Sequence, residues 1–463
     1  MAEAGSPGGK TKEASVFGRM RTLWTGRVTA QEGGETAMTK KLKRRDFLAG
    51  VGAGATTALS ARSVSGANDQ IRCGVIGVGG RGTHLLGLVL KTAGVRVTAV
   101  CDIQPAHLQR GIERVVRAGQ PRPAGFGERG PKDYRRMLEG RNLDAVVIAT
   151  PMQDHAVMAI DALRAGKAVL SEVAACMTMD ECWGLVRAVE ETGSFYMLAE
   201  NCCYMRPQMQ VMNMVRQGLF GGITYAECGY VHDCRFLHFN ADGSLTWRGE
   251  LARDYLGNLY PTHSLGPVAR WMGINRSDRF VSLVAMSTRA FGPHKNAVKK
   301  FGPDSPQAKI SFRNGDSTTT LIRTASGAVV DLRYDTTSSR PHRTTVYYAL
   351  QGETASYRSV TGEIWIESRS KRYQWEPMNR YAAEFDDPMW TKWAKAAAGS
   401  GHGGADFFEI RDFFGALREG RPSPIDVYDA VTWSCIIPLS AESIRRGSQP
   451  VEVPDFTRNR RRA

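Results

Sequence analysis

Apolar runs and helical periodicity alternate along residues 71–199. Short apolar runs with the character of buried strands lie at residues 71–78, 95–101, 143–149, 168–171 and 195–199. Between them apolar positions recur at helical spacing, as over 178–192 and in a helix that Asp154 can cap and that ends near Ala165. Strands that alternate with helices form a parallel sheet with helices on both faces. We therefore expect an α/β domain with a doubly wound parallel sheet over residues 68–200.

A different pattern follows Asn201. Longer segments with period-two alternation lie at 224–232, 280–286, 317–324, 328–336 and 344–352. The pairs Asn314-Gly315 and Ser326-Gly327 are typical of tight hairpin turns. These features predict a C-terminal α+β domain with an open, mostly antiparallel sheet over residues 201–457. Helical patterns at 209–217, 407–418 and 427–445 complete it, and we expect the last two to pack against the first domain.

A glycine-rich segment, residues 77–82, follows the first predicted strand and precedes a helix. Gly77, Gly79 and Gly82 fit G-x-G-x-x-G, in which the glycines permit a tight turn, the approach of a pyrophosphate and close packing of the helix. The helix N-terminus then offers free N–H groups to the phosphates. Asp102 ends the next strand and can accept hydrogen bonds from a ribose 2′-hydroxyl, which favours NAD over NADP. This predicts an NAD-binding Rossmann domain; a glycine-rich turn in another α/β domain is the alternative.

Positive charge is concentrated at the two ends of the chain. The formal net charge is +15, but residues 1–67 hold eleven Lys or Arg against five Asp or Glu, and the chain closes with Arg458, Arg460, Arg461 and Arg462. The body between them is modestly basic and has no basic stripe with interleaved aromatic residues. We therefore expect no nucleic-acid partner. The segment 458–463 is predicted to be a solvated basic tail.

Nine cysteines are scattered along the chain, with no C-x-x-C pair and no cysteine–histidine cluster at zinc spacing. The odd number argues against a complete disulfide framework. Most are therefore predicted to be small buried side chains, and no metal site is predicted.

The N-terminal segment, residues 1–67, resembles a twin-arginine export signal. Basic residues at 40–45 include Arg44-Arg45, and they precede a weakly apolar stretch at 49–59 and a small-residue cleavage site at 65–67. The stretch is too short and too glycine-rich for a stable membrane span. Met38 is a natural start for such a signal, which leaves residues 1–37 as a leader or an over-extended reading frame. We predict export to the periplasm or the exterior; a basic disordered arm is the alternative.

Several segments resemble a group of sugar-active, nicotinamide-dependent proteins. Thr150, Pro151, His155 and the segment 165–172 are similar to the Gfo/Idh/MocA superfamily. The segments 200–206, 213–218, 260–267, 401–406 and 454–457 resemble glycoside hydrolase family 109 more specifically. The resemblance covers nearly all of residues 70–457. It implies an NAD-dependent α-N-acetylgalactosaminidase that holds NAD without releasing it.

The candidate site residues fall into two groups. The expected NAD contacts are Gly77, Gly79, Gly80, Arg81, Gly82, Asp102, Thr150, Pro151, His155, Glu172 and Asn201. The expected sugar contacts are Tyr204, Arg206, Trp247, Arg248, Tyr260, His263, Arg340 and His402. A structural role is equally open for His402, which lies in a glycine-rich loop.

Two departures from the superfamily pattern bear on the chemistry. Dehydrogenases of the superfamily read Glu-Lys-Pro where this chain reads Glu172-Val173-Ala174. They also place an aspartate four residues before the catalytic histidine, where this chain has Leu259, although His263 is retained. A site without that lysine and aspartate suits a generic alcohol dehydrogenase poorly.

We therefore expect hydrolysis of a glycosidic bond without net redox change. The sugar is oxidised at C3, the C1 substituent is eliminated across C1–C2, water adds at C1 and C3 is reduced again, with NAD as the reversible hydride acceptor. His263 is the candidate base for the C3 hydroxyl, since an imidazole pKa of about 6.5 suits that role. Tyr260, on the same face as His263 if this segment is helical, or Tyr204 acts at C2 or on the leaving group, or stacks on the sugar. Glu172 is expected to orient the nicotinamide or the substrate.

Two other functions stay open on the sequence alone. One is an exported NAD(P)-dependent sugar oxidoreductase, and the other is a non-catalytic protein that binds a sugar or a nucleotide. The expected ligand is a small-molecule or glycan-terminal sugar. The resemblance and the large open sheet also lead us to expect a homo-oligomer.

Overall fold

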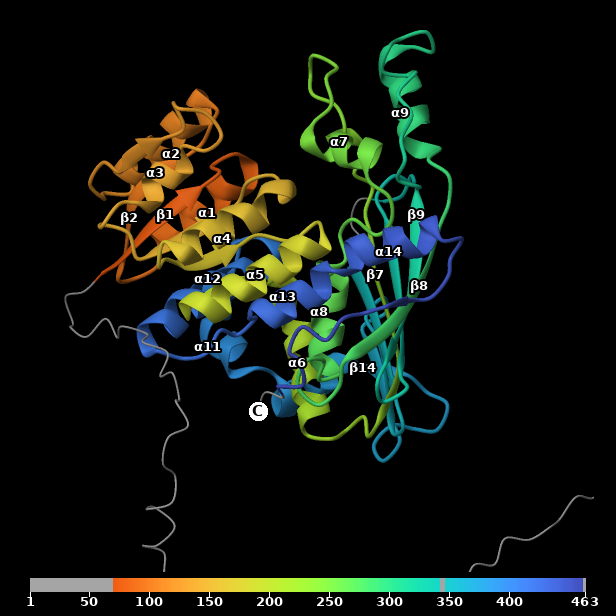
Figure 1. Cartoon of the computed structure of the whole chain (residues 1–463). Coiled ribbons are helices and arrows are strands. Elements are labelled where there is room, and N and C mark those ends of the chain that lie inside the picture. Colours follow the sequence, from red (N-terminus) through yellow and green to blue (C-terminus); the bar gives the residue numbers. More distant parts are fainter. Residues whose placement is uncertain (1–69, 342–345, 461–463) are drawn as a thin grey trace, which may run out of the picture. The chain divides into compact units, whose positions relative to one another are not determined.

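The computed structural model describes residues 70–341 and 346–460 (Figure 1). The twin-arginine segment, its cleavage site and residues 461–463 lie outside these ranges, so the structure does not bear on the predictions made for them. None of the helices within the described ranges is long and apolar enough to cross a membrane.

The first domain is built on a six-stranded parallel sheet. In sheet order the strands are β3 (Ala124–Phe126), β2 (Val95–Cys101), β1 (Ile71–Ile76), β4 (Ala145–Ile148), β5 (Ala168–Ser171) and β6 (Tyr196–Leu198). This is the strand order of dinucleotide-binding folds. Every residue of β4 is apolar and buried, as expected for a parallel strand covered on both faces. The predicted doubly wound sheet is therefore confirmed.

Helices connect these strands: α1 (Gly80–Leu90), α2 (Pro105–Arg117), α3 (Tyr134–Leu138), α4 (His155–Arg164) and α5 (Met179–Thr192). Helix α5 begins at a capping box, in which Thr178 and Glu181 each accept a hydrogen bond from the other's backbone N–H. The cap predicted for α4 is wrong, because the Asp154 side chain makes no capping hydrogen bond. A 3₁₀ turn, Met152–Asp154, holds that residue in helical geometry, whereas a capping residue needs an extended backbone.

The second domain contains a nine-stranded sheet. In sheet order its strands are β14 (Glu376–Pro377), β13 (Glu363–Ile366), β12 (Ala355–Arg358), β11 (Val346–Gly352), β7 (Ile223–Val231), β10 (Val329–Asp335), β9 (Ser317–Thr324), β8 (Phe280–Ser287) and β15 (Val451–Glu452). Neighbouring strands are antiparallel apart from β7 and β10, which are parallel. Strand β9 alternates buried and more exposed residues, the pattern of a sheet with one covered face. The expected mostly antiparallel sheet is confirmed.

One of the two predicted hairpin turns is present. Ser326-Gly327 joins β9 to β10, with Gly327 at φ 95°. Asn314-Gly315 is not a hairpin turn, because the chain between β8 and β9 contains helix α9 (Gly292–Phe301). Gly315 instead permits a close approach of two chain segments, since a Cβ there would lie 2.0 Å from the Thr288 carbonyl oxygen.

The late helices join the two domains. Helix α12 (Ala405–Glu419) lies against α1, and α13 (Val427–Ser434) lies against α5 and β6, as predicted (Figure 1). Helix α14 (Ile436–Arg445) packs on β8 instead. The helix predicted over 427–445 is thus two helices that meet at Cys435. Pro438 explains the break, because it cannot donate a helical hydrogen bond to Ser434 and its ring crowds the preceding turn.

The other helices of the second domain are α6 (Arg206–Arg216), α7 (Trp247–Asp254), α8 (Thr262–Trp271), α10 (Ala382–Phe385) and α11 (Pro388–Ala397). Helix α8 packs on β7 and β11. His263 in its first turn contacts Glu200, which follows β6 of the first domain. The nine cysteines are all free and buried, in agreement with the interpretation of most of them as small core side chains.

The described part of the predicted basic tail, residues 458–460, is exposed and approaches α5. Arg458 and Arg460 lie 3.4 and 3.5 Å from the carboxylate of Glu190 on α5. The Arg458 guanidinium also lies 5.5 Å from the ring centre of Trp183. Both arginines are largely exposed, in keeping with a solvated tail, so these ion pairs add little stability.

Candidate active site

The glycine turn between β1 and α1 has the shape that a dinucleotide requires. Gly77 has φ 83°, and a Cβ there would lie 2.8 Å from the backbone of Ala149. A Cβ on Gly82 would lie only 1.7 Å from the Gly77 carbonyl oxygen. Gly79 and Gly80 instead have open space, with no atom closer than 3.7 Å to a Cβ at either position. The first and third glycines are thus required by the fold, and the residues between them leave room for a ligand.

Asp102 is held at the end of β2 by the backbone around it. Its Oδ2 accepts from the Val78 N–H and its Oδ1 from the Gln104 N–H, both at 2.8 Å. A carboxylate can accept about four hydrogen bonds, so acceptor capacity remains for a ribose hydroxyl. The position and the remaining capacity both fit NAD.

His155 has a structural role in the described structure. Its Nδ1 lies 2.9 Å from the Ala174 carbonyl oxygen, and its Nε2 lies 2.9 Å from the Thr150 carbonyl oxygen. The imidazole therefore links the segment after β4, Thr150-Pro151, to the segment after β5. These are the carboxyl ends of neighbouring strands, where nucleotides bind in folds of this kind.

Arg81, in the first turn of α1, lies within a group of carboxylates. Its Nε donates to Glu172 at 2.5 Å and its Nη1 to Asp406 at 2.6 Å, and its Nη2 lies 3.7 Å from Glu409. Glu172 follows β5, and Asp406 and Glu409 lie on α12. Burial lowers the pKa of Arg81, but the three carboxylates outweigh it and raise that pKa. One guanidinium thus joins the nucleotide domain to the late helix.

Two acids in this group have opposite protonation tendencies. Burial raises the pKa of Asp406, but hydrogen bonds from His402, His84 and Arg81 outweigh it and hold the pKa well below its usual range. Burial and the neighbouring carboxylates raise the pKa of Glu409 well above its usual range. Neither carboxylate oxygen of Glu409 has a hydrogen-bond partner in the described structure. The group therefore holds Asp406 as an anion and favours a neutral Glu409.

His263 forms a buried pair with Glu200. Its Nδ1 lies 2.7 Å from Glu200 Oε1, and that oxygen also accepts from the Cys202 N–H at 3.1 Å. Burial lowers the pKa of His263, but the charge of Glu200 more than offsets this and raises it. Burial raises the pKa of Glu200, and the imidazole outweighs that effect and lowers it. With Nδ1 donating to the carboxylate, Nε2 is the nitrogen that can accept a proton.

The Cys202 sulfur belongs to the same neighbourhood. One ligand-type atom from each of Glu200, Cys202 and His263 lies within 4.8 Å of the others. Burial raises the pKa of the Cys202 thiol well above its usual value, which keeps it protonated. In the described structure the Glu200 carboxylate instead accepts hydrogen bonds from His263 and from the Cys202 N–H.

Aromatic rings surround His263. The ring centres of Tyr260, Tyr230 and His402 lie 5.0, 5.7 and 6.3 Å from that of His263. Burial raises the pKa of both tyrosines, so their phenols stay protonated. The Arg248 guanidinium lies 4.1 Å from the Trp247 ring centre and 6.0 Å from that of Tyr260. Four of these side chains line a small cavity of about 40 Å³, together with Tyr334: Tyr230, Trp247, Arg248 and Tyr260.

The helical relation predicted between Tyr260 and His263 is wrong. Helix α8 begins at Thr262, so Tyr260 precedes it in irregular backbone. The two rings nevertheless meet, and together with Tyr230 they form a cluster in which each ring contacts the other two. The structure therefore brings the two side chains together by a route other than helical spacing.

Comparison with known proteins agrees with this architecture. The family described as "Oxidoreductase family, NAD-binding Rossmann fold" matches residues 71–200, and "Glycosyl hydrolase 109, C-terminal domain" matches residues 204–462. A "Glycosyl hydrolase family 109 protein" of Stenotrophomonas maltophilia is 39% identical over 436 residues, which cover 90% of this chain and 96% of that protein. The chain belongs to glycosyl hydrolase family 109.

Two further proteins are similar to this family 109 enzyme. The "Alpha-N-acetylgalactosaminidase" of Tannerella forsythia is 36% identical to it over 408 residues, 84% of this chain and 86% of that one. A solved levoglucosan dehydrogenase in complex with NADH is 20% identical and covers 83% of this chain and 100% of its own, with a TM-score of 0.65. That structure shows a shared fold. The family 109 enzyme is a hydrolase that uses NAD.

Three of the expected sugar contacts are engaged elsewhere in the family 109 enzyme. The Tyr204 hydroxyl donates to Asp412 at 2.9 Å, and Tyr204 lines a separate cavity with Arg270. Two arginines form ion pairs with neighbouring acids, Arg206 with Asp386 and Arg340 with Asp335. Trp247, Arg248, Tyr260, His263 and His402 are the expected sugar contacts that the structure brings together.

Glu200, Asp406 and Tyr230 are among the residues of the family 109 site that the sequence analysis did not identify. Glu200 directly precedes Asn201, and Asp406 closes the Gly-His-Gly-Gly-Ala segment, so both lie inside motifs that resemble the family. Tyr230 lies in a predicted strand, where tyrosine is common, and nothing local distinguishes it. Only proximity to His263 or Arg81 shows what these three side chains do.

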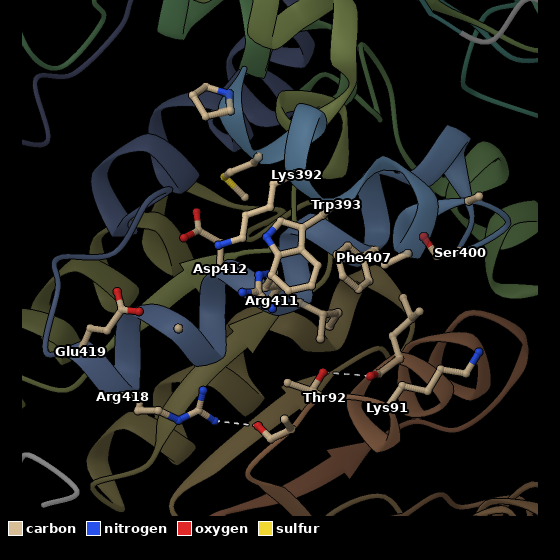
Figure 2. Close-up of a pocket in the computed structure, with 18 of the residues that line it drawn as sticks. Lys91, Thr92, Lys392, Trp393, Ser400, Phe407, Arg411, Asp412, Arg418 and Glu419 are labelled. Carbon is tan, nitrogen blue, oxygen red and sulfur yellow. Dashed lines mark hydrogen bonds between the residues drawn. The ribbon is translucent and has the colours of Figure 1, made fainter. Parts of the chain in front are cut away.

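A wide cavity in the described structure lies apart from this chemistry. It measures about 800 Å³ and is lined by α11, α12 and the end of α1, with Trp393, Phe407 and Arg411 among its side chains (Figure 2). Asp406 and Glu409 project from α12 toward Arg81. Helix α12 therefore separates this cavity from the buried acids of the active site.

Proposed function

We propose that the enzyme removes terminal α-N-acetylgalactosamine from glycosides by transient oxidation at C3. The observation that carries the proposal is the buried pair of Glu200 and His263, which faces an aromatic cluster beside an NAD-binding domain. The name of the Tannerella forsythia relative supports the choice of sugar. Val173, in place of the lysine typical of the related dehydrogenases, supports hydrolysis over net oxidation.

The chain's residues divide the work between them. NAD, when bound, supplies reversible hydride acceptance, which is the chemistry that oxidation at C3 requires. His263 Nε2 accepts the proton of the C3 hydroxyl, and Glu200 holds the imidazole in the required tautomer and supports its positive charge. Arg81 donates a hydrogen bond to Glu172 and fixes it at the carboxyl end of β5, where Glu172 orients the substrate or the cofactor.

The aromatic cluster supplies binding and proton donation. Tyr260 and Tyr230 remain protonated, so each can donate a hydrogen bond to a sugar or leaving-group oxygen. Trp247, with Arg248 stacked on it, offers a flat surface and a cation beside these hydroxyls. Oxidation at C3 gives a ketone, which acidifies the C2–H of the sugar. Loss of that proton lets the C1 substituent leave by elimination, after which water adds at C1 and C3 is reduced again.

Isotope incorporation tests the proposal. The purified enzyme, without added NAD, is incubated in D₂O with nitrophenyl α-N-acetylgalactosaminide and its β-anomer, and the released sugar is analysed by NMR. We expect release of the sugar with deuterium at C2. A product without deuterium there would exclude the elimination. A ketosugar formed in proportion to NADH would instead identify a sugar oxidoreductase.

We also propose that the protein is exported by the twin-arginine route. The support is the sequence at 40–67, with Arg44-Arg45 and a weakly apolar stretch after them. Export of a folded protein suits an enzyme that takes up its cofactor before it leaves the cytoplasm. Cell fractionation of the full chain and of an Arg44→Lys, Arg45→Lys variant tests this, and retention of the variant in the cytoplasm is expected. Equal export of both proteins would rule the route out.

We also propose that the protein forms a homo-oligomer. Large apolar side chains are exposed on three strands of the nine-stranded sheet: Tyr225 on β7, Met286 on β8 and Leu321 on β9. Such side chains on a sheet face favour association with a second copy. Light scattering coupled to gel filtration measures the mass directly. A monomer at all concentrations would contradict the expectation.

A further inference from the structure

Asp406 connects segments that are far apart in the sequence. Its carboxylate accepts from Arg81 (2.6 Å) and His84 (2.8 Å) on α1, from Asn201 (2.7 Å) after β6, and from His402 (3.0 Å) in the loop at 399–404. We propose that Asp406 is a positioning residue that clasps the 399–404 loop onto the first turn of α1 and thereby slows the release of NAD. This role differs from glycoside cleavage, because it concerns how long the cofactor stays bound.

The shape of the loop depends on the hydrogen bonds that Asp406 accepts, which we call the Asp406 clasp. Gly401, His402, Gly403 and Gly404 have φ values of 92°, 44°, 68° and 106°, so four successive residues have positive φ. For His402 this region is unfavourable, because its Cβ crowds the backbone. The contact with Asp406 offsets that cost by fixing the imidazole 3.0 Å from both carboxylate oxygens.

The loop backbone is packed directly on the clasp. A Cβ on Gly401 would lie 2.3 Å from Asp406 Oδ2 and 2.7 Å from His84 Nε2. Glycine at this position therefore lets the main chain contact the aspartate and the histidine at once. The Asp406 side chain is fully buried, so water does not weaken its hydrogen bonds.

The residues held by Asp406 lie at both ends of the region that binds a dinucleotide. Arg81 is in the first turn of α1 and His84 is at the start of the second, and the N-terminus of this helix binds phosphates in this fold. Asn201 follows β6, at the carboxyl edge of the sheet. The loop must separate from Asp406 before it can move away from the first turn of α1. The rate of that separation then limits how fast NAD can leave.

Substitution Asp406→Asn tests the clasp directly. Asparagine keeps the size of the side chain but loses the negative charge. It also replaces one carboxylate oxygen by an NH₂ group, which cannot accept a hydrogen bond from the surrounding nitrogen donors. The purified holoenzyme is mixed with excess 1,N⁶-etheno-NAD, and exchange is followed by the fluorescence that remains on the protein after desalting. We expect exchange to be about 10–100-fold faster, the factor for one or two charge-assisted hydrogen bonds. This readout does not depend on turnover.

The matched control is Glu419→Gln, which removes a carboxylate from the exposed end of the same helix, where it pairs with Arg421. Exchange in this variant should equal that of the unmodified enzyme. A folded Asp406→Asn protein that exchanges at the unmodified rate would overturn the proposal.

A second variant keeps the test decisive if Asp406→Asn fails to fold. His402→Ala removes the loop's own contact and leaves the ion pair of Arg81 and Asp406 in place. Faster exchange is expected here too, and the double variant should exchange no faster than Asp406→Asn alone, because both changes open the same contact. Unchanged exchange in His402→Ala would show that the loop does not retain the cofactor, whatever the outcome of the glycosidase assays.

Discussion

The cofactor side and the sugar side of this active site are built over different distances along the chain. On the cofactor side, the glycine turn and Asp102 belong to one strand–helix–strand unit, β1–α1–β2. On the sugar side, His263 comes from α8, Glu200 from the end of β6 and Tyr230 from β7. The first arrangement is encoded by neighbouring residues, and the second exists only once both domains are folded. Substitutions on the sugar side should therefore lower turnover, whereas substitutions in the glycine turn on the cofactor side should lower folding stability.

The largest effect is expected for His263→Ala on the sugar side. Loss of a general base should lower kcat by about 10²–10⁴-fold. The NAD content of the purified protein should not change, because the glycine turn and Asp102 are untouched. Hydrolysis of nitrophenyl α-N-acetylgalactosaminide and quantification of bound NAD check both statements. Loss of NAD together with activity would show that the two sides are not separable.

Glu200→Gln should have the next largest effect. The carboxylate raises the pKa of His263, so its removal should lower that pKa. The imidazole must be neutral to accept a proton, and the acidic limb of the kcat/KM profile should therefore move to lower pH. The maximum rate should fall about 10–100-fold, the cost seen when a hydrogen-bonded partner that orients a metal-ligating histidine is removed. A profile that moves to higher pH would contradict the assigned pair.

Gly82→Ala should act on the cofactor side through packing alone. Its Cβ would meet the Gly77 carbonyl oxygen at 1.7 Å, and forced overpacking costs about 1–3 kcal/mol of unfolding free energy. The matched control is Gly80→Ala, where no atom lies within 4 Å of the added Cβ. Denaturant unfolding should separate the two variants, and equal stability would exclude the close approach.

Glu409→Gln should act on stability alone, and its effect should be visible as a change with pH. The pKa of Glu409 is raised in the folded protein, so the unfolded chain loses this proton at lower pH. The stability that depends on the proton is present at low pH and is lost as pH rises from the unfolded pKa, about 4.3, toward the folded one. The Glu409→Gln variant cannot lose a proton at this position, so its stability does not fall in this way. Its Tm relative to the parent should therefore increase between pH 4 and neutral pH, and a decrease would show that Glu409 is charged.

Much of the fold was predictable because its signals are local. The buried strands of the first domain are continuous apolar runs, and strands such as β9 alternate with period two, so both sheets followed from hydrophobic pattern. Of two errors, one arose where a distant residue decided the outcome and the other where a single proline interrupts a helical pattern. Asn314-Gly315 has the composition of a hairpin turn, yet its neighbour is the Thr288 backbone. Residues 427–445 keep a helical pattern through Pro438, where the backbone cannot continue.

The candidate site was predictable to the extent that its residues lie in short motifs. The glycines of the turn, Asp102, Glu172 and His263 were identified from their order along the chain. Tyr204 and Arg206 lie in an equally suggestive motif, but their polar groups contact Asp412 and Asp386. Glu200 and Asp406 were missed as site residues, because a carboxylate shows its role only through the histidine or arginine that it contacts.

The sequence by itself determined that this chain has a dinucleotide turn, an acid at the ribose position and a histidine in a motif of sugar-active proteins. These depend on backbone conformation and residue order over short stretches, which neighbouring residues set. Only the tertiary structure decided that Glu200 supports His263 and that Asp406 holds α1, the end of β6 and the 399–404 loop together. Hydrogen bonds and charge interactions act over a few ångströms in space, and residues more than 300 positions apart, such as Arg81 and Asp406, come within that range only when the chain folds.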